Sequence, residues 1–381
     1  MAASTSTDPA RDTLDAQRWT RAGLAELTGA PDGPPLGPPA GFLPRLDALT
    51  DRIRTASSAL GQPVQLDGTD ALTARVELLG LRRRGQVSCG GACHLVEAAD
   101  GWLAASLSRP DDWELLAAWL GLPPGGGGER WPEVHERCAR LRRDEVVARG
   151  ALLGLPVAAL GEAAATPERP SVLARTVGRS PRPRGATRLR VADLSSMWAG
   201  PLCGSVLARA GAEVLKVESV TRPDGARGGP AELYELLNGA KEEVRLDLGS
   251  PGGVGRLQQL LRTVDVVIES ARPRALRQLG VRAEELLADP AGPTVWVSIT
   301  GYGREGPGAN RVAFGDDAAV AGGLVGWWEQ RPTFCADAIA DPLTGLTAAA
   351  AALEALAAER PVLLDVAMSR VAAHFAGAAP R

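Results

Sequence analysis

Several residue types are scarce in this chain of 381 residues, and each scarcity excludes a class of protein. Its five cysteines are odd in number and scattered, which argues against a disulfide framework and is typical of a cytoplasmic protein with free thiols. Cys89, Cys93 and His94 are neighbours in the sequence, but no second pair of ligands completes a metal site, so we expect no metal. Lysine is almost absent and the net charge is -3, and neither feature indicates a nucleic-acid partner.

Long apolar runs are also missing. No run reaches the roughly 18 apolar residues that a membrane-spanning helix needs, so we expect no membrane segment. Residues 1–12 carry no basic region followed by an apolar run, and we therefore do not interpret them as a secretory signal. Hydrophobic residues still make up 45% of the chain, which is enough for a sizeable core and predicts two domains.

The chain does contain a strand–helix–strand pattern over residues 188–218, around which the rest is organised. Leu189 and Val191 begin an apolar strand that ends at a Ser-Ser pair. Ala-Gly-Pro then opens a helix, since proline suits the first helical turn, and Gly211 ends it before a second apolar strand. Two strands joined by one such helix pair in parallel. Ligands of parallel sheets bind at the carboxyl ends of the strands, here around residues 195–200.

The alternation of strands and helices continues to the C-terminus and predicts an α/β fold. Further strands are expected over 244–248, 264–269, 295–300 and 362–367, and a long helix over 342–358. We expect residues 188–381 to form a Rossmann-like large domain with a parallel sheet, residues 1–165 a smaller α+β domain, and the Pro- and Arg-rich stretch 166–187 a linker. In the smaller domain we expect helices over 14–28, 43–60, 71–81, 111–120 and 131–153, and strands over 86–88, 94–98 and 102–106.

Three familiar ligand motifs are absent from the sequence. The turn after the first strand reads DLSSMWAGPLCG, without the GxGxxG of a dinucleotide fold, and the chain has neither a P-loop nor a GxSxG elbow. Glu218 ends the second strand, where a ribose-binding acid would lie. Without the glycine fingerprint we interpret Glu218 as a structural acid that anchors a loop.

Five segments follow one another in a specific order. They read VADLSSMWAGPLCGSVLARAGAEVLKVE, LLNGAKEEVRLDL, VDVVIESARPRALRQLG, VWVSITGYGREGP and IADPLTGLTAAAAALEAL. Together they resemble the family III CoA-transferases, also called the CaiB/BaiF family, which includes the α-methylacyl-CoA racemases. The resemblance covers residues 188–381. It implies a Rossmann-like domain that carries no dinucleotide, no tightly bound cofactor, and a CoA thioester as substrate.

The resemblance implies that the acid in IADPLTG, Asp341, is the nucleophile. A carboxylate can attack a thioester to form a mixed anhydride and CoA thiolate, and the thiolate can return to give an aspartyl-CoA thioester that an incoming acid then exchanges. Asp341 also precedes Pro342 and a long helix, whose dipole would keep the carboxylate ionised. A plain helix N-cap is the alternative interpretation of an aspartate in this position.

The resemblance also implies where CoA binds. Contacts come from the first turn and from loops after later strands, at Met197, Trp198, Ala199, Leu246, Asp247, Ser270 and Ala271. The cations that would meet CoA phosphates by charge pairing are Arg222, Lys241, Arg272 and Arg274, with solvated surface side chains as the alternative. The segments around these cations depart from the family's usual Asn-Arg-x-Lys-Arg and Glu-Asn-Phe-Arg-Pro-Gly patterns.

Two further features differ from the family pattern. The racemase branch needs a histidine in a Gly-His-Asp stretch as one of two acid/base groups, and here Gly315-Asp316-Asp317 stands instead. The order of domains is changed, because residues 101–162 resemble the small domain that usually follows the large one. A circular permutation or a tandem fusion explains this order, and residues 22–41 look like a faded second copy without an acid at the nucleophile position.

From these observations we expect a cytoplasmic, homodimeric CoA-transferase. It would move CoA between an acyl-CoA and a carboxylic acid, without a nucleic-acid or membrane partner. A non-catalytic CoA-binding homologue and a racemase-like epimerase are the alternatives.

Overall fold

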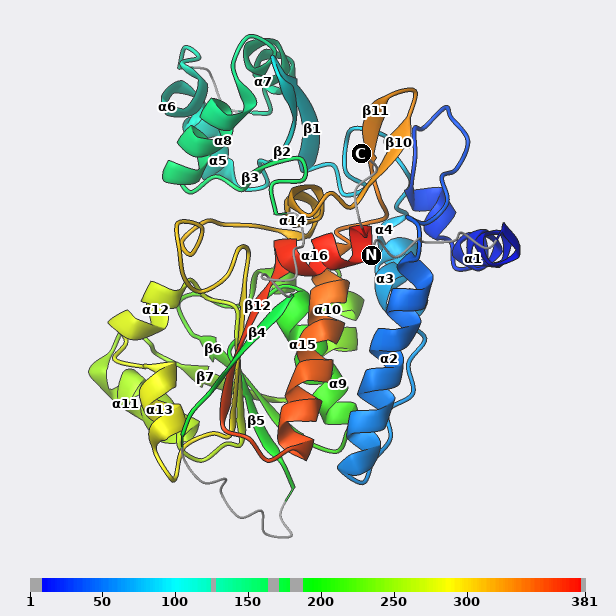
Figure 1. Cartoon of the computed structure of the whole chain (residues 1–381). Coiled ribbons are helices and arrows are strands. Elements are labelled where there is room, and N and C mark those ends of the chain that lie inside the picture. The colour runs from blue at the N-terminus through cyan, green and yellow to red at the C-terminus, as the bar shows by residue number, and fades with distance from the viewer. Residues whose placement is uncertain (1–8, 125–127, 164–170, 179–187, 378–381) are drawn as a thin grey trace.

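The computed structural model describes residues 9–124, 128–163, 171–178 and 188–377. Its largest sheet has seven strands in the order β4-β12-β9-β8-β5-β6-β7 (Figure 1). They are β4 (Val172–Thr176), β5 (Arg190–Asp193), β6 (Glu213–Ser219), β7 (Glu242–Leu246), β8 (Val266–Glu269), β9 (Val295–Thr300) and β12 (Val362–Ala367). Within the described part of this sheet, β4 is antiparallel to β12 and every other pair is parallel. The predicted α/β fold with a mainly parallel sheet is confirmed.

The order of the strands reverses at β5. From β5 the chain adds β6 and β7 on one side and then β8, β9 and β12 on the other. In such sheets a ligand crevice lies outside the carboxyl ends of the strands, where two neighbouring connections leave in opposite directions. The segments after β5 and β8, residues 194–198 and 270–272, therefore mark the candidate crevice.

Apolar residues that alternate along the strands fill two layers of core. Helices α2 (Phe42–Ala59), α9 (Ala199–Arg209) and α15 (Ala340–Ala357) cover one face, and α11 (Pro251–Leu261), α12 (Pro273–Gln278) and α13 (Ala283–Ala288) cover the other. Val266 and Ile268 of β8 are buried with the first set of helices, whereas Val267 is buried with the second. Burial on both faces is what the continuous apolar run in this strand predicts.

Helix α15 lies in the first layer and is buried on nearly every side. Its many alanines let neighbouring helices approach closely. A Cβ placed on Gly345 would lie only 2.6 Å from the carbonyl oxygen of Ala199 at the start of α9. Glycine therefore fits best here, and the N-terminal half of α15 lies directly against the turn that follows β5.

The N-terminal segment packs on the same layer. It contains α1 (Pro9–Arg21), η1 (Leu24–Leu27), α2, α3 (Gly68–Thr73) and α4 (Val76–Leu79). Trp19 and Phe42 are fully buried in one core cluster with Val191 of β5. The prediction that residues 1–165 form a single smaller unit is therefore wrong for residues 19–89. Helical periodicity shows that a helix has an apolar face but does not show what covers that face.

Residues 93–160 form a smaller unit with a core of its own. Its elements are β1 (Cys93–Ala98), β2 (Gly101–Ser106), α5 (Pro110–Glu114), α6 (Leu116–Leu120), α7 (Trp131–Cys138), α8 (Arg143–Leu152) and β3 (Val157–Ala159). The strands form a sheet in the order β1-β2-β3, and Trp119 is fully buried in the core. The single helix predicted over 131–153 is divided into α7 and α8. Asp100 of the hairpin accepts a hydrogen bond from the N–H of Arg143 at 2.7 Å, which caps α8 as a separate helix.

The predicted linker over 166–187 contains a strand. Val172–Thr176 form β4, which pairs with β12 and extends the large sheet, so the linker prediction is wrong for these residues. Residues 164–170 and 179–187 lie outside the described part of the chain. The aperiodic composition concealed β4 because an edge strand with mainly exposed side chains needs no apolar run.

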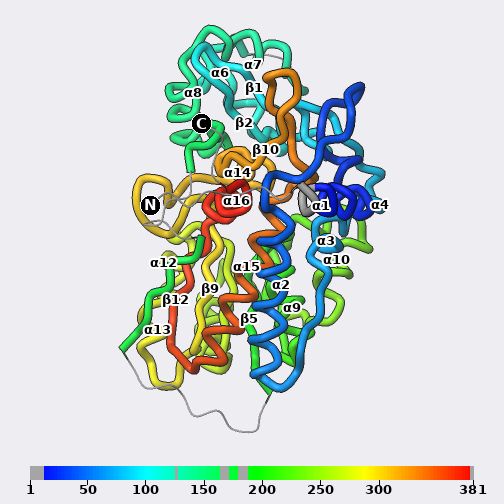
Figure 2. The backbone as a smooth tube through the Cα atoms, turned by 45° about the vertical axis from the view of Figure 1, so that its right-hand side comes forward, coloured from blue at the N-terminus to red at the C-terminus, as the bar shows by residue number. Residues whose placement is uncertain are grey.

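Helix α14 (Gly315–Ala321) joins the two units. Figure 2 shows α14 and α16 (Met368–Ala376) between the smaller unit and the large sheet. Ser106 of β2 donates a hydrogen bond to buried Asp317 of α14 at 2.8 Å. The remaining elements are η2 (Gly225–Gly228), α10 (Ala231–Asn238) and the hairpin of β10 (Val325–Trp328) and β11 (Arg331–Phe334). None of the described helices has both the length and the apolar character needed to cross a membrane.

Candidate active site

The turn between β5 and α9 has a fixed shape that depends on glycine. β5 ends at Asp193, whose carboxylate accepts hydrogen bonds from the backbone N–H and the hydroxyl of Ser195. A Cβ on Gly200 would collide with Ser195, so a turn this tight requires glycine there. Met197 adopts a positive φ of 73°, and its N–H donates to Asp224 at 2.9 Å. The turn that the sequence predicts as a CoA contact is therefore ordered by its own hydrogen bonds.

Two buried ion pairs lie behind this turn. Lys216 Nζ lies 2.7 Å from Asp224 and Lys241 Nζ lies 2.8 Å from Asp193, with all four side chains fully buried. Lys241 donates two further hydrogen bonds, to a backbone carbonyl at 2.8 Å and to Asn238 at 2.9 Å. All three N–H groups of the ammonium are used. The prediction that Lys241 meets a CoA phosphate is therefore wrong.

Glu218 anchors the loop after β6. It accepts a hydrogen bond from the N–H of Asp224 at 2.9 Å, pairs with Arg227 at 2.8 Å and accepts from the hydroxyl of Tyr234 at 2.9 Å. Although burial opposes the effect, the hydrogen bonds from Arg227 and Asp224 lower the pKa of Glu218 to about 2. The interpretation of Glu218 as a loop-anchoring acid is confirmed.

The other predicted CoA contacts lie along the carboxyl ends of the strands. Ser270 accepts a hydrogen bond from the N–H of Ser196 at 3.1 Å and so ties the loop after β8 to the first turn. The exposed or half-buried members are Met197, Asp247, Ser270, Ala271 and Arg272, whereas Trp198, Ala199 and Leu246 are buried. The structure therefore brings the loops after β5 and β8 together at the crevice.

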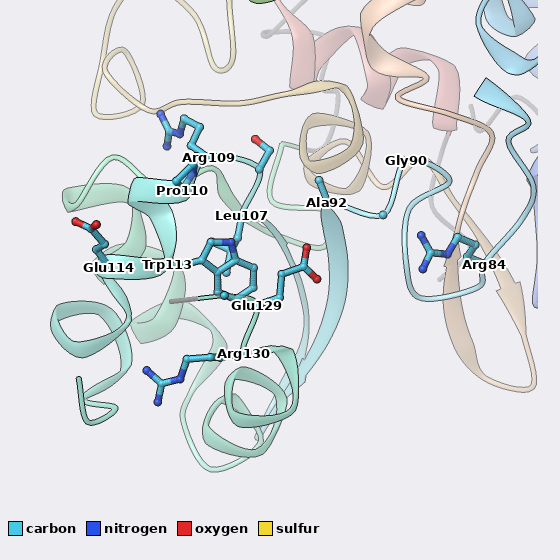
Figure 3. Close-up of a pocket in the computed structure, with 13 residues that line it drawn as sticks. Arg84, Gly90, Ala92, Leu107, Arg109, Pro110, Trp113, Glu114, Glu129 and Arg130 are labelled. Carbon is cyan, nitrogen blue, oxygen red and sulfur yellow. The ribbon is translucent and has the colours of Figure 1, made fainter. Parts of the chain in front are cut away.

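Three arginines without ion pairs to any described residue lie near this crevice. Arg222, Arg272 and Arg274 are all exposed. Burial lowers the pKa of Arg272, and the positive charges of Arg274, Arg109 and Arg222 lower it further. Arg109 belongs to the smaller unit, just before α5 (Figure 3). Arg109 therefore lies close enough to act on Arg272, although it is itself paired with Asp112 at 2.6 Å.

Three aspartates, Asp316, Asp337 and Asp341, form a second feature that we call the acid cluster. Asp316 is on α14, Asp337 precedes α15, and Asp341 lies in the first turn of α15. The N-cap of α15 is Ile339, which makes no side-chain capping bond, so the plain N-cap interpretation of Asp341 is wrong. The N–H of Gly315 donates instead to the Asp341 carboxylate, and a Cβ on Gly315 would collide with that carboxylate.

One arginine reaches the acid cluster from the N-terminal segment. Arg75, between α3 and α4, donates two hydrogen bonds to Asp337, one from Nε and one from Nη2 at 2.8 Å. Its guanidinium also lies over the indole of Trp198, 5.0 Å from the ring centroid. Asp337 is fully buried between Ala336 and Ala338, which adopt positive φ angles of 56° and 42°. Non-glycine residues in this conformation are concentrated at functional sites.

Burial and mutual repulsion raise the pKa values of Asp316 and Asp341. Burial raises the pKa of Asp341 to about 7; Arg75 opposes this shift, and Asp316 and Asp337 add to it. Burial and the charge of Asp337 raise the pKa of Asp316, also to about 7. Neighbouring acids that titrate near neutrality are typical of covalent or acid/base catalysis. No group of three or more His, Cys, Asp or Glu side chains in the described structure is arranged to hold a metal ion.

Trp198 connects the turn between β5 and α9, which we call the first turn, to the acid cluster. It packs with Leu237 and Ala338, and its indole N–H is buried without a hydrogen-bond partner in the described structure. Sequence reasoning identified Trp198 and Asp341 but missed Arg75 and Asp337. Arg75 is a single arginine in an expected helix, and no motif surrounds it. Asp337 lies four residues before Asp341, and that spacing was the only signal available.

A pocket of about 710 Å³ lies beside the smaller unit (Figure 3). It is lined by Arg84, Gly90, Gly91, Ala92, Leu107, Ser108, Arg109, Pro110, Trp113, Glu114, Gly128, Glu129 and Arg130. Arg109 and Arg130 are already paired with acids outside the lining, and the two lining glutamates outnumber the remaining arginine, Arg84. No predicted site residue lines this pocket. It approaches the acid cluster at Gly90, where a Cβ would lie 3.7 Å from Nη2 of Arg75.

Comparisons with known proteins assign the C-terminal half. The family model for CoA-transferase family III matches residues 187–379. The chain is 34% identical over 184 residues to a succinyl-CoA–D-citramalate CoA-transferase of Chloroflexus aurantiacus, covering 46% of each. It is 33% identical over 187 residues to a succinate–glutarate CoA-transferase of Agrobacterium fabrum, covering 44% of this chain and 46% of the relative. The chain thus spans about half the length of these curated relatives. A CaiB/BaiF family protein from Brucella suis matches with a TM-score of 0.45 and 29% identity, covering 49% of this chain and 53% of that structure.

Proposed function

Because the chain belongs to CoA-transferase family III, we propose that it moves CoA from an acyl-CoA thioester to a carboxylic acid, with Asp341 as the nucleophile. The observation that carries this proposal is the setting of Asp341. Its carboxylate is only partly exposed, receives the N–H of Gly315, and titrates near neutrality because of burial. Asp341 also lies in the first turn of α15, where the helix dipole favours the charged form.

The proposed reaction has two symmetrical halves. A carboxylate oxygen of Asp341 attacks the thioester carbonyl, the C–S bond breaks, and a mixed anhydride and CoA thiolate form. The thiolate then attacks the Asp341 carbonyl, which releases the donor acid as a carboxylate and leaves an aspartyl-CoA thioester. The acceptor carboxylate attacks this thioester, and the released thiolate attacks the acceptor's acyl carbon. The new acyl-CoA leaves and the Asp341 carboxylate is regenerated, so that atoms and charge balance.

The crevice supports binding of the CoA part of the substrate. We place the pantetheine thiol end near the first turn, where Trp198 links the crevice to the acid cluster. Arg222, Arg272 and Arg274 form no ion pair with any described residue, and their guanidiniums suit the phosphates because charge-assisted hydrogen bonds to phosphate are among the stronger polar contacts. We do not include Lys241 among these cations, because all three N–H groups of its ammonium are used inside the fold. We include Arg274 instead.

Small carboxylic acids are the acceptor class that we propose. The named activities of the matched relatives concern citramalate, succinate and glutarate. A further relative, from Clostridioides difficile, is named a (R)-2-hydroxy-4-methylpentanoate CoA-transferase and is 33% identical over 183 residues. We therefore propose dicarboxylic and 2-hydroxy acids as the first acceptors to test. We also propose a homodimer, which the family resemblance implies.

Intact-mass spectrometry after incubation with a panel of acyl-CoAs tests the proposal. We expect a CoA-sized, hydroxylamine-labile adduct on the wild type, no adduct on Asp341→Ala, and an unchanged adduct on Asp51→Ala. Asp51 is the matched control because its side chain is 68% exposed on α2 and does not belong to the acid cluster. An adduct that persists in Asp341→Ala refutes the role of Asp341. CoA binding without an adduct from any donor indicates the non-catalytic homologue, and exchange of the α-proton with deuterium indicates the epimerase.

A further inference from the structure

The acid cluster holds three carboxylates and has one arginine in direct contact. Around the acid cluster, the facing groups come from five parts of the chain. Arg75, Gly315, Asp316 and Asp337 act on Asp341 itself. Ser88 and Cys89, before β1, face Asp316 or Asp337, and Trp198 faces Arg75. Among these described neighbours, Arg75 supplies the positive charge. The charge on Asp341 therefore depends on where that single guanidinium is held.

Arg75 is held by contacts with two side chains. Two hydrogen bonds join it to buried Asp337, and the indole of Trp198 lies beneath its guanidinium. Gly90 lies close to the guanidinium, since a Cβ there would be in van der Waals contact with Nη2 at 3.7 Å. The side chain is 23% exposed, so it is fixed mainly by protein contacts. A planar guanidinium that pairs through two bonds and stacks on a ring has a defined orientation, which a lysine would not reproduce.

We propose that Arg75 is a positioning residue for the Asp341 nucleophile: it neutralises Asp337, stacks on Trp198, and thereby keeps Asp341 ionised beside the CoA-binding turn. The N-terminal segment packed on the large sheet thus completes the active site of the C-terminal half. This inference rests on the proposed function, because it concerns the same nucleophile.

The physical reason is the balance of charge in a buried place. Without Arg75, Asp337 is buried with no counter-charge and repels Asp341 more strongly. Removing the charge of Asp337 instead leaves Arg75 free to act on Asp341 and Asp316. The two changes must therefore shift the titration of Asp341 in opposite directions, which loss of structure alone would not do.

The test is the pH dependence of aspartyl-CoA formation in Arg75→Met, Arg75→Lys and Asp337→Asn. Formation requires the carboxylate, so the wild-type rate rises with pH through about 7. In Arg75→Met we expect this rise to move to higher pH by about one pH unit or more, with the rate largely recovered at high pH. We expect Asp337→Asn to move the rise in rate to lower pH. In Arg75→Lys the rise should occur at a pH between those of the wild type and Arg75→Met.

A matched control is Arg52→Met. Arg52 also joins the N-terminal segment to α15 by an ion pair, with Glu354 at 2.7 Å, but on the last turns of α15 and away from the acid cluster. It should leave the pH profile unchanged. A loss of rate in Arg75→Met that is equal at every pH, or no change at all, overturns the inference and indicates a structural role or none.

Carbon-13 NMR of labelled aspartate carboxyls gives a readout that needs no activity. Subtracting the Asp341→Asn spectrum assigns the Asp341 signal, and its titration midpoint is then followed in wild type and Arg75→Met. A midpoint that rises in Arg75→Met supports the inference even if no acyl-CoA reacts, in which case the proposed function alone fails. A midpoint that does not move overturns the inference, whatever the activity.

Discussion

Replacing Lys241 by methionine should destabilise the fold without a direct effect on the affinity for CoA. The Lys241 ammonium lies 2.8 Å from Asp193, and both side chains are fully buried. Methionine has a similar volume but leaves the Asp193 carboxylate buried without its nearest counter-charge. Removing one partner of a buried ion pair costs about 3–5 kcal/mol. The charge of Lys216 also favours the ionised form of Asp193, so we expect a loss near the lower end, about 3 kcal/mol.

A double mutant shows how much of this loss comes from leaving the Asp193 charge without a partner. Asp193→Asn together with Lys241→Met removes both charges and should lose less stability than Lys241→Met alone, because no uncompensated buried charge is left. Arg245→Met is the exposed control: Arg245 pairs with Glu243 at 3.2 Å with 59% of its side chain exposed. An exposed pair of this kind contributes less than about 1 kcal/mol.

Urea unfolding followed by tryptophan fluorescence measures these losses, and calorimetric titration of CoA at a temperature where every variant is folded measures affinity. We expect Lys241→Met to unfold at lower urea and to bind CoA about as tightly as the wild type. The opposite pattern, with unchanged unfolding and a CoA affinity lowered tenfold, would refute the reasoning. It would make Lys241 the phosphate contact that the family resemblance implies.

Two further predictions concern buried carboxyls. Because burial raises the pKa of Asp341 from 3.8 to about 7, the folded state binds this proton more tightly than the unfolded state, and stability falls as pH rises between those values. Asp341→Asn removes that dependence, so its free energy of unfolding in urea, relative to that of the wild type, should increase with pH. A difference between the two proteins that stays constant with pH would contradict the reasoning. Ser106→Ala removes the 2.8 Å hydrogen bond to buried Asp317 and should cost about 1–3 kcal/mol in urea unfolding, whereas exposed Ser108→Ala should cost less.

The sheet was predictable because its strands carry their own signals. β8 and β12 consist of apolar residues apart from one acid each, and every residue of each is buried. The alternation with helices then required parallel pairing. The N-terminal segment was assigned to the wrong unit because its helices show only that they have an apolar face. Phe42 is buried against α15 and α16 residues such as Phe375, about which local periodicity gives no information.

The candidate site divides in the same way. The first turn and Asp341 belong to contiguous motifs, so the sequence located them. Arg75 and Asp337 are separated by 262 positions, and the ion pair between them exists only after the N-terminal segment has packed on α15. Lys241 was predicted from a motif but lies inside the fold, because a motif gives the residue type and not the direction of the side chain.

The carboxylates at the ends of β5 and β6 indicate how this crevice leaves charge available for a ligand. Asp193 ends β5 and Glu218 is the second-last residue of β6. Parallel sheets usually present ligand-binding groups there, yet both acids are used inside the protein. Their partners fix the turn at Met197 and the loop that carries Arg222, since Asp224 receives the Met197 N–H and is itself tied to Glu218. With these acids paired, Arg222, Arg272 and Arg274 remain near the crevice without an ion pair to any described residue. A crevice built in this way favours an anionic ligand over a ribose hydroxyl, which is consistent with CoA phosphates and explains why the glycine-rich dinucleotide turn is not needed.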